Sequence, residues 1–154
     1  MSRIEQVLDK LTTLEGFYPS TPASDEAIAT LEEEFGVKLP FSYRAFLKRF
    51  GVATVGDGMV AGIHNSNPHD ATGSILHNTR CYRKQWNLPD NLLIIEPNED
   101  APYCFDTSKA DAAGDYPLVC YELHNGFYKE IAPDFETWLE DFVIFRFSDS
   151  DDED

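Results

Sequence analysis

The chain has 154 residues, 42% of them hydrophobic, which is enough for one globular domain with its own core and too little for an independent second one. Twelve Lys and Arg stand against 28 Asp and Glu, so the formal net charge is -16. A surface of this charge repels nucleic acid and anionic membranes, and the expected partner is therefore basic or neutral.

The three cysteines, Cys81, Cys104 and Cys120, are an odd number without CxxC spacing, which predicts free thiols in a reducing compartment. The first five residues lack the basic and then apolar pattern of a signal peptide. The most apolar runs, 92–95 and 142–145, are far shorter than the ~20 residues of a membrane helix. We therefore expect a soluble cytoplasmic protein.

Three helices are expected in the first third of the chain. Apolar residues recur at helical spacing over 4–14, behind a serine that can act as N-cap. The second helix lies between Ser24 as N-cap and Gly36, and the third begins at Pro40 and ends before Gly51.

The segments around these helices predict a connector, a hairpin and a loop. Residues 17–23 contain two prolines and suit a short extended connector. Residues 52–55 and 59–63 flank Gly56-Asp57-Gly58 and predict a hairpin. Residues 64–73 show no periodicity and predict a polar surface loop.

A fourth helix, capped by Ser74, is expected to run to about Trp86 with its apolar residues, Trp86 included, near one face. Asn125-Gly126 predicts a hairpin with a type I′ turn, because both residues tolerate positive φ. Four strands are expected in this part of the chain, at 92–96, 102–106, 117–123 and 127–131.

A final helix begins at Ala132-Pro133-Asp134 and places its aromatic and aliphatic residues on one side. Residues 149–154 include five acids and predict a disordered acidic tail. Helices at both ends with strands between them indicate an α+β fold over residues 1–148, a single domain with a mostly antiparallel twisted sheet flanked by helices.

A metal site has little support in the sequence. His77 and Cys81 are four residues apart on the expected fourth helix and could give zinc two ligands, with His64 and His69 nearby. No CxxC or HExxH accompanies them, so a packed cysteine and a solvated histidine are the favoured interpretation. We expect no metal and no cofactor.

Nucleophilic catalysis is also disfavoured. Cys120 with His124, or Cys104 with Asp106, could suggest a thiol and its partner. Alternation along a strand instead favours a small buried cysteine beside polar residues. No GxSxG, P-loop or GxGxxG motif is present, so we expect no enzyme and no small-molecule substrate.

The expected contact surface is acidic and aromatic. Its acids come from strand ends and loops, which can gather on one rim of a sheet, and its tyrosines are favoured interface anchors. Alternative interpretations remain open. The acids could be solvated loop residues or could include the carboxylate pair of a hydrolase, and the tyrosines could be half-buried residues of the sheet. The candidate partner-binding residues are Asp57, His64, Asn65, Glu96, Glu99, Asp100, Tyr103, Asp106, Glu122 and Tyr128.

The order of these signals resembles the SUKH superfamily. The resemblance covers residues 24–143, and its most specific parts are Leu39-Pro40-x-x-Tyr43 and Cys104-Phe105-Asp106-Thr107. It implies an α+β fold without a catalytic set. It also implies, for bacterial members, a cytoplasmic immunity protein that neutralises a cognate polymorphic toxin, often a nuclease, and for fungal relatives a cell-wall synthesis regulator and interaction hub.

The resemblance and the charge together predict an antitoxin that blocks the basic cleft of a secreted toxin, in particular a nuclease. The alternative is a non-enzymatic intracellular scaffold or cell-wall synthesis regulator on the same fold. The sequence does not separate the two.

Overall fold

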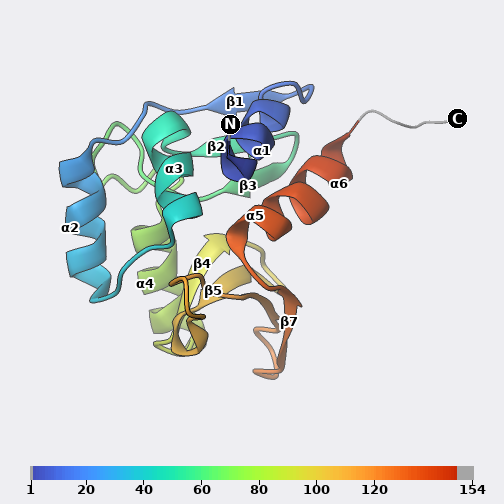
Figure 1. Cartoon of the computed structure of the whole chain (residues 1–154). Coiled ribbons are helices and arrows are strands. Elements are labelled where there is room, and N and C mark those ends of the chain that lie inside the picture. The colour runs from blue at the N-terminus through green and yellow to red at the C-terminus, as the bar shows by residue number, and fades with distance from the viewer. Residues whose placement is uncertain (1, 149–154) are drawn as a thin grey trace, which may run out of the picture.

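Helices pack around two antiparallel sheets in the computed structural model, which describes residues 2–148 (Figure 1). The helical elements are α1 (Arg3–Leu11), α2 (Asp25–Phe35), α3 (Phe41–Phe50), α4 (Ile75–Trp86), the 3-10 turn η1 (Thr107–Lys109), α5 (Phe135–Trp138), the π-helix η2 (Leu139–Ile144) and α6 (Phe145–Phe147). The strands are β1 (Phe17–Pro19), β2 (Ala53–Val55), β3 (Gly58–Val60), β4 (Leu92–Glu96), β5 (Tyr103–Asp106), β6 (Leu118–Tyr121) and β7 (Tyr128–Ala132). The expected α+β class is confirmed, and the strands divide between two sheets.

Local capping explains why α1, α2 and α4 begin where the sequence predicts. Ser2 forms a capping box with Glu5 at the start of α1. The side chains of Ser24 and Ser74 each accept a bond from the backbone N–H three residues later, at α2 and α4. Gly36 ends α2 in the left-handed conformation, at φ 70°.

The smaller sheet has the order β1-β2-β3. Its hairpin β2–β3 confirms the prediction around Gly56-Asp57-Gly58. The connector predicted for 17–23 is partly a strand, because Phe17–Pro19 pairs antiparallel with β2. Pro19 is tolerated there because β1 is an edge strand and needs no ladder bond from that position.

The larger sheet has the order β4-β5-β6-β7, and all its pairs are antiparallel. The type I′ turn predicted at Asn125-Gly126 is wrong. Gly126 has a positive φ of 74°, but Asn125 does not. The N–H of Gly126 donates to the carbonyl of Glu122 at 2.8 Å, so the connection is a longer, helix-like turn. Leu123, which belongs to this turn, is buried.

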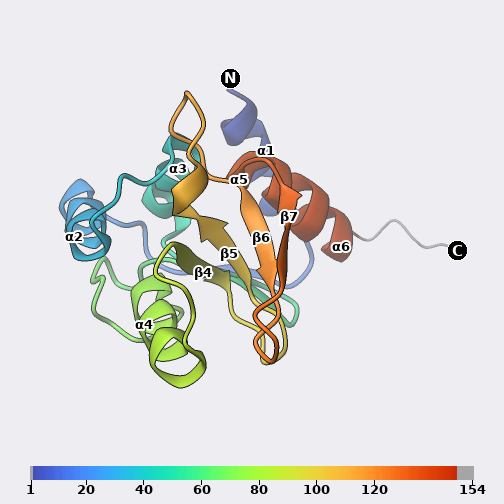
Figure 2. The same ribbon diagram turned by 90° about the horizontal axis from the view of Figure 1, so that it is seen from below.

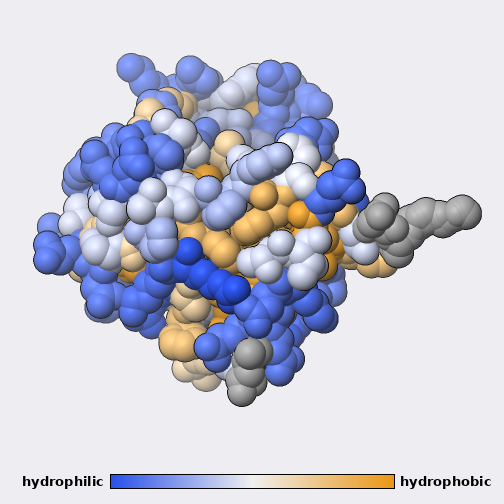
Figure 3. Space-filling model, turned by 90° about the horizontal axis from the view of Figure 1, so that it is seen from above, coloured by the Kyte–Doolittle hydropathy of each residue, from blue (hydrophilic) through white to orange (hydrophobic). Residues whose placement is uncertain are grey.

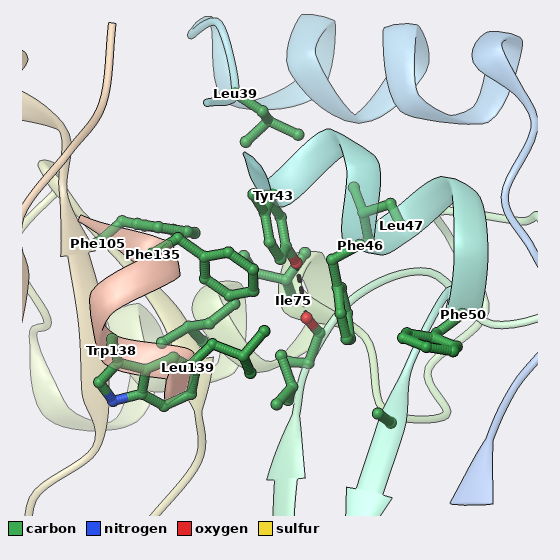
Figure 4. Packing of buried hydrophobic residues seen from close by; sticks show 14 of the residues in the cluster. Leu39, Tyr43, Phe46, Leu47, Phe50, Ile75, Phe105, Phe135, Trp138 and Leu139 are labelled. Carbon is green, nitrogen blue, oxygen red and sulfur yellow. Dashed lines mark hydrogen bonds between the residues drawn. The ribbon is translucent and has the colours of Figure 1, made fainter. Parts of the chain in front are cut away.

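The main core lies where α3 and α5 meet one face of the larger sheet (Figure 4). The Tyr43 ring packs edge-on against Phe105 and Phe135, with centroids 5.1 and 5.2 Å away. Its buried hydroxyl donates to the carbonyl of Ala61 at 2.6 Å. The N–H of Ala61 donates in turn to Ile95 at 2.7 Å, which ties the two sheets together.

The C-terminal helix is interrupted, which the sequence did not predict. Its inward residues follow the expected side, with Trp138 and Leu139 fully buried, but the middle of the segment is the π-helix η2. Beyond it, the Phe147 ring covers Gly56 and Gly58 of the β2–β3 hairpin, since a Cβ on Gly58 would lie 2.9 Å from that ring. The predicted acidic tail, 149–154, lies outside the described residues.

Candidate partner-binding surface

Two of the ten candidate residues are buried and serve the fold. Asp106 has no exposed surface and accepts bonds from Asn91 and from the backbone and hydroxyl of Ser108, at 2.8, 3.0 and 2.6 Å. Burial alone would raise the pKa of Asp106, but these hydrogen bonds outweigh it and hold the pKa below its ordinary value. The prediction that Asp106 lies on an exposed rim is therefore wrong.

Glu96 is the second buried acid, with 8% of its surface exposed. Both of its carboxylate oxygens accept from the Arg146 guanidinium, at 3.0 and 3.1 Å. The N–H of Met59 also donates to it, at 3.4 Å. Glu96 thus links β4, the β2–β3 hairpin and α6, and it too does not belong to an exposed rim.

Tyr103 is half-buried against Trp138 and Phe142, on the face of the larger sheet that the C-terminal helices cover. Burial raises the pKa of its hydroxyl. Tyr103 therefore contributes to packing more than to an open surface.

Three further candidates belong to the smaller sheet and its following loop. Asp57 is exposed at the tip of the β2–β3 hairpin. His64 is half-buried, with Nδ1 2.6 Å from the hydroxyl of Ser20. Asn65 is exposed at φ 54°, and its Oδ1 accepts a bond of 3.4 Å from Thr21. None of these three lines the surface formed by the remaining candidates.

The structure brings the remaining four, Glu99, Asp100, Glu122 and Tyr128, to one end of the larger sheet. Glu99 and Asp100 lie on the β4–β5 loop, and Glu122 and Tyr128 flank the β6–β7 turn; both connections lie at the same end of the sheet in Figure 2. The N–H of Leu123 donates to the carbonyl of Asp100 at 3.0 Å and holds the loop against the turn. We call the exposed carboxylates of Glu99, Asp100 and Glu122 the acidic end.

The aromatic part of this surface includes the candidate Tyr128, but the position of Trp86 was not predicted. Trp86, which we expected on the buried face of its helix, is 37% exposed, and Phe127 and Tyr128 are 55% and 39% exposed. The indole of Trp86 meets the imidazole of His124 edge-on, with centroids 5.4 Å apart. A shallow groove lies beside this contact, lined by Tyr82, Gln85, Trp86, Glu99, Asp100 and His124.

A signal for the position of Trp86 is present in the sequence. Lys84 and Gln85 precede Trp86, and Asn87 follows it as a residue that tolerates the left-handed conformation of a helix C-terminus. Asn87 does adopt φ 54° and ends α4. A tryptophan in the last turn of a helix with polar neighbours is favoured at the surface, half-covered.

The acidic end differs in its ion pairing from other carboxylates of the fold. Glu34 binds Arg80 at 2.6 Å, and Glu140 binds Lys10 at 2.9 Å, and these cations hold the pKa of both carboxyls below the ordinary value. Among residues 2–148, no ion pair uses Glu99, Asp100 or Glu122. Because these carboxylates are exposed and no ion pair within the described residues offsets them, this end attracts cations.

A different character marks the face seen from above in Figure 3, opposite to the view of Figure 2. Apolar side chains form a band across this face between hydrophilic ones. Two of the exposed aromatic residues outside the acidic end are Tyr18 on β1 and Phe145 on α6, at 72% and 77%. This face therefore offers apolar contact.

Two of the three cysteines, Cys104 and Cys120, lie in surroundings that disfavour a thiolate. Burial raises the pKa of Cys104, and burial together with the carboxylate of Glu122 raises that of Cys120. Both shifts keep the thiols protonated, which is the opposite of what a nucleophile needs. Asp106 directs its bonds to Asn91 and Ser108 and not to Cys104.

His77 and Cys81, the two side chains that could have offered zinc ligands from one helix, lie close together. The Cys81 sulfur lies 3.5 Å from Nε2 of His77. Within the part of the chain that the structure describes, no group of three or more His, Cys, Asp or Glu side chains could hold a metal ion. Over the same residues, no helix is both long and apolar enough to cross a bilayer.

Two comparisons with known proteins agree with this fold. The SUKH_5 family model, described as SMI1-KNR4 cell-wall, matches residues 4–145. A crystal structure of a protein from Pseudomonas syringae pv. tomato superposes with a TM-score of 0.61 at 16% sequence identity, over 93% of this chain and 97% of that chain. At this identity the second likeness concerns the fold alone.

Proposed function

The chain belongs to the SUKH family of SMI1-KNR4 proteins, and we propose that it is an immunity protein that binds and neutralises a cognate secreted toxin, in particular a basic nuclease. The family includes immunity proteins and SMI1/KNR4-like proteins. The proposed role is binding and not catalysis, and it is exercised in the cytoplasm, where a nuclease meets its substrate.

The observation that carries this proposal is the acidic end itself. Glu99, Asp100 and Glu122 lie together and exposed, with no cation partner among residues 2–148, in a protein of net charge -16. Beside them, Trp86, Phe127 and Tyr128 expose aromatic surface. Carboxylates beside aromatic anchors are complementary in charge and contact chemistry to a basic protein surface.

The mechanism follows from competition for the same cations. A nuclease presents Lys and Arg to phosphate groups, and the acidic end can occupy those side chains in place of the substrate. Exposed carboxylates steer the two proteins together, so they should govern the association rate and its salt dependence. Desolvated aromatic contacts should govern the dissociation rate.

The test is a search of the neighbouring genes for a toxin domain, followed by coexpression of that domain with this protein, scored by cell survival, and by titration calorimetry at low and high salt. The triple variant Glu99→Gln, Asp100→Asn, Glu122→Gln should bind about tenfold or more weakly at low salt. A matched variant that removes three exposed charges elsewhere, Glu15→Gln, Glu26→Gln, Glu33→Gln, should bind as the wild type does. Equal loss in both variants would assign the effect to net charge and reject the acidic end. Absence of binding heat at every ionic strength would reject the function.

A second candidate is favoured by the cell-wall description of the family. On this proposal the same surface binds several endogenous proteins as a scaffold or cell-wall synthesis regulator. Affinity purification distinguishes the two, because a scaffold returns a set of endogenous partners, whereas an immunity protein returns one tight toxin complex.

A further inference from the structure

We propose that the groove beside Trp86 is a binding site for one guanidinium or ammonium group, contributed by a Lys or Arg side chain of the partner. The inference rests on the proposed function and assigns its specificity to a defined place. The groove is lined by Tyr82, Gln85, Trp86, Glu99, Asp100 and His124.

The lining combines the two chemistries that recognise an organic cation. Glu99 and Asp100 supply carboxylates, which form strong charge-assisted bonds with guanidinium and ammonium groups. Trp86 supplies an exposed indole next to them, and tryptophan is the aromatic side chain that attracts cations best. A cation in this groove would therefore meet carboxylates and an aromatic surface at once.

The helix below the groove adds a third favourable contribution. Trp86 is the last residue of α4, whose twelve residues end at Asn87. The free carbonyls at a helix C-terminus carry partial negative charge and favour a cation nearby. The cations of this turn leave the position open, because Arg83 donates to the carbonyl of Asp90 at 2.8 Å and Lys84 lines a different groove.

The groove is held in shape before any ligand arrives. Oδ1 of Asn98 accepts from the N–H groups of Asp100 and Ala101, at 2.8 and 2.9 Å. The hydroxyl of Tyr82 donates to the carbonyl of Asn98 at 3.3 Å, which fixes the same loop to α4. Together with the bond from Leu123 to Asp100, these contacts reduce the entropy lost when a side chain is captured.

Other ligand classes fit less well. An anion would be repelled by two carboxylates and by the partial negative charge at the C-terminus of α4. An apolar group would leave both carboxylates without a partner. A metal ion is disfavoured because residues 2–148 contain no cluster of three or more side chains able to coordinate it, so Glu99, Asp100 and His124 do not form one.

The chain offers a direct readout, because it has only two tryptophans and the other, Trp138, is fully buried. Titration with N-acetyl-arginine amide, followed by the two indole N–H signals in a proton–nitrogen correlation spectrum, should shift the Trp86 signal saturably and leave Trp138 unchanged. N-acetyl-glutamine amide, at the same ionic strength, should shift neither. An equal response to both probes, or no response of Trp86, would overturn the proposal.

The matched variants sharpen this experiment. Glu99→Gln with Asp100→Asn should weaken arginine-amide binding at least tenfold. The double variant removes no side-chain hydrogen bond or ion pair of the fold, since neither side chain makes one among the described residues. Glu26→Gln with Glu33→Gln removes the same charge from α2 and should leave binding unchanged. If the two double variants respond alike, the groove is not the site.

Failure of the site and failure of the proposed function give different results. The probe titration needs no toxin, so a saturable Trp86 response without any toxin binding would reject the immunity role and keep the cation site. Toxin neutralisation that survives intact in Glu99→Gln with Asp100→Asn would keep the immunity role and reject the groove as its contact.

Discussion

The hydrogen bond between Tyr43 and Ala61 is a sharp test of how the two sheets are held together. The Tyr43 hydroxyl and the Ala61 carbonyl are both buried, 2.6 Å apart, and Ala61 is also the residue that bonds to Ile95 across the sheets. Tyr43→Phe removes the donor and keeps the ring contacts. Because water cannot reach the abandoned carbonyl, the free energy of unfolding should fall by about 1–3 kcal/mol. For a chain of this size, each kcal/mol corresponds to a decrease in Tm of about 2–4 °C.

Tyr116→Phe is the matched control for this measurement. Its hydroxyl makes a bond of the same length, 2.6 Å, to the carbonyl of Lys38, but Lys38 is exposed and water can take the place of the lost donor. We expect a loss of about 0.5–1 kcal/mol there. Urea denaturation followed by circular dichroism, with an unchanged m-value, measures both. If Tyr43→Phe is no more destabilising than Tyr116→Phe, burial of the Ala61 carbonyl does not determine the cost.

Two further predictions concern the C-terminal segment and pH. Gly58→Ala would place a Cβ 2.9 Å from the Phe147 ring, so that this ring or the segment that carries it must shift; we expect a loss of about 1–3 kcal/mol in urea denaturation, and a much smaller loss when Phe147→Ala is already present. Burial and neighbouring carboxylates raise the pKa of Asp115, so its contribution to stability is present below the ordinary carboxyl pKa and is lost as pH rises through the higher folded value. We therefore expect Asp115→Asn to be at least as stable as the wild type at pH 7 and to lose stability relative to the wild type at pH 4, as measured by thermal unfolding at both pH values. A variant that gains stability relative to the wild type at pH 4 would contradict the raised pKa.

Local signals in the sequence were sufficient for most of the helices and strands. Ser24 and Gly36 bound α2 as predicted, because capping and the left-handed glycine conformation depend on a few neighbouring residues. The same is true of the β2–β3 hairpin. The β6–β7 turn differs from the predicted type I′ turn. Burial of Leu123 favours a longer connection over a tight two-residue turn. That preference is a property of the packed sheet and not of the Asn125-Gly126 pair.

The surface was less predictable than the fold because burial of a charged residue depends on distant partners. Glu96 ends the expected strand 92–96 and Glu99 follows it by three residues, and the sequence makes both of them candidates for an exposed acidic rim. Arg146, fifty residues further along, pairs with Glu96, which is buried, whereas no cation within residues 2–148 forms an ion pair with Glu99. Trp86 was misplaced for a related reason, since helical periodicity gives the side of a helix but not where the neighbouring elements stop covering it.

Pairing, and not the count of acids, therefore defines where this protein can attract a partner. Glu34, Glu96 and Glu140 are neutralised by cations within the fold, and Asp106 is occupied by hydrogen-bond donors. The carboxylates that remain outside these pairs keep a field that is not cancelled at short range, and at the acidic end three of them lie beside the exposed rings of Trp86, Phe127 and Tyr128. Long-range attraction scales with total charge and is screened beyond about 8 Å at physiological salt, so specificity must come from this local arrangement. The two charge-matched triple variants carry the same net charge, and any difference between them measures that arrangement directly.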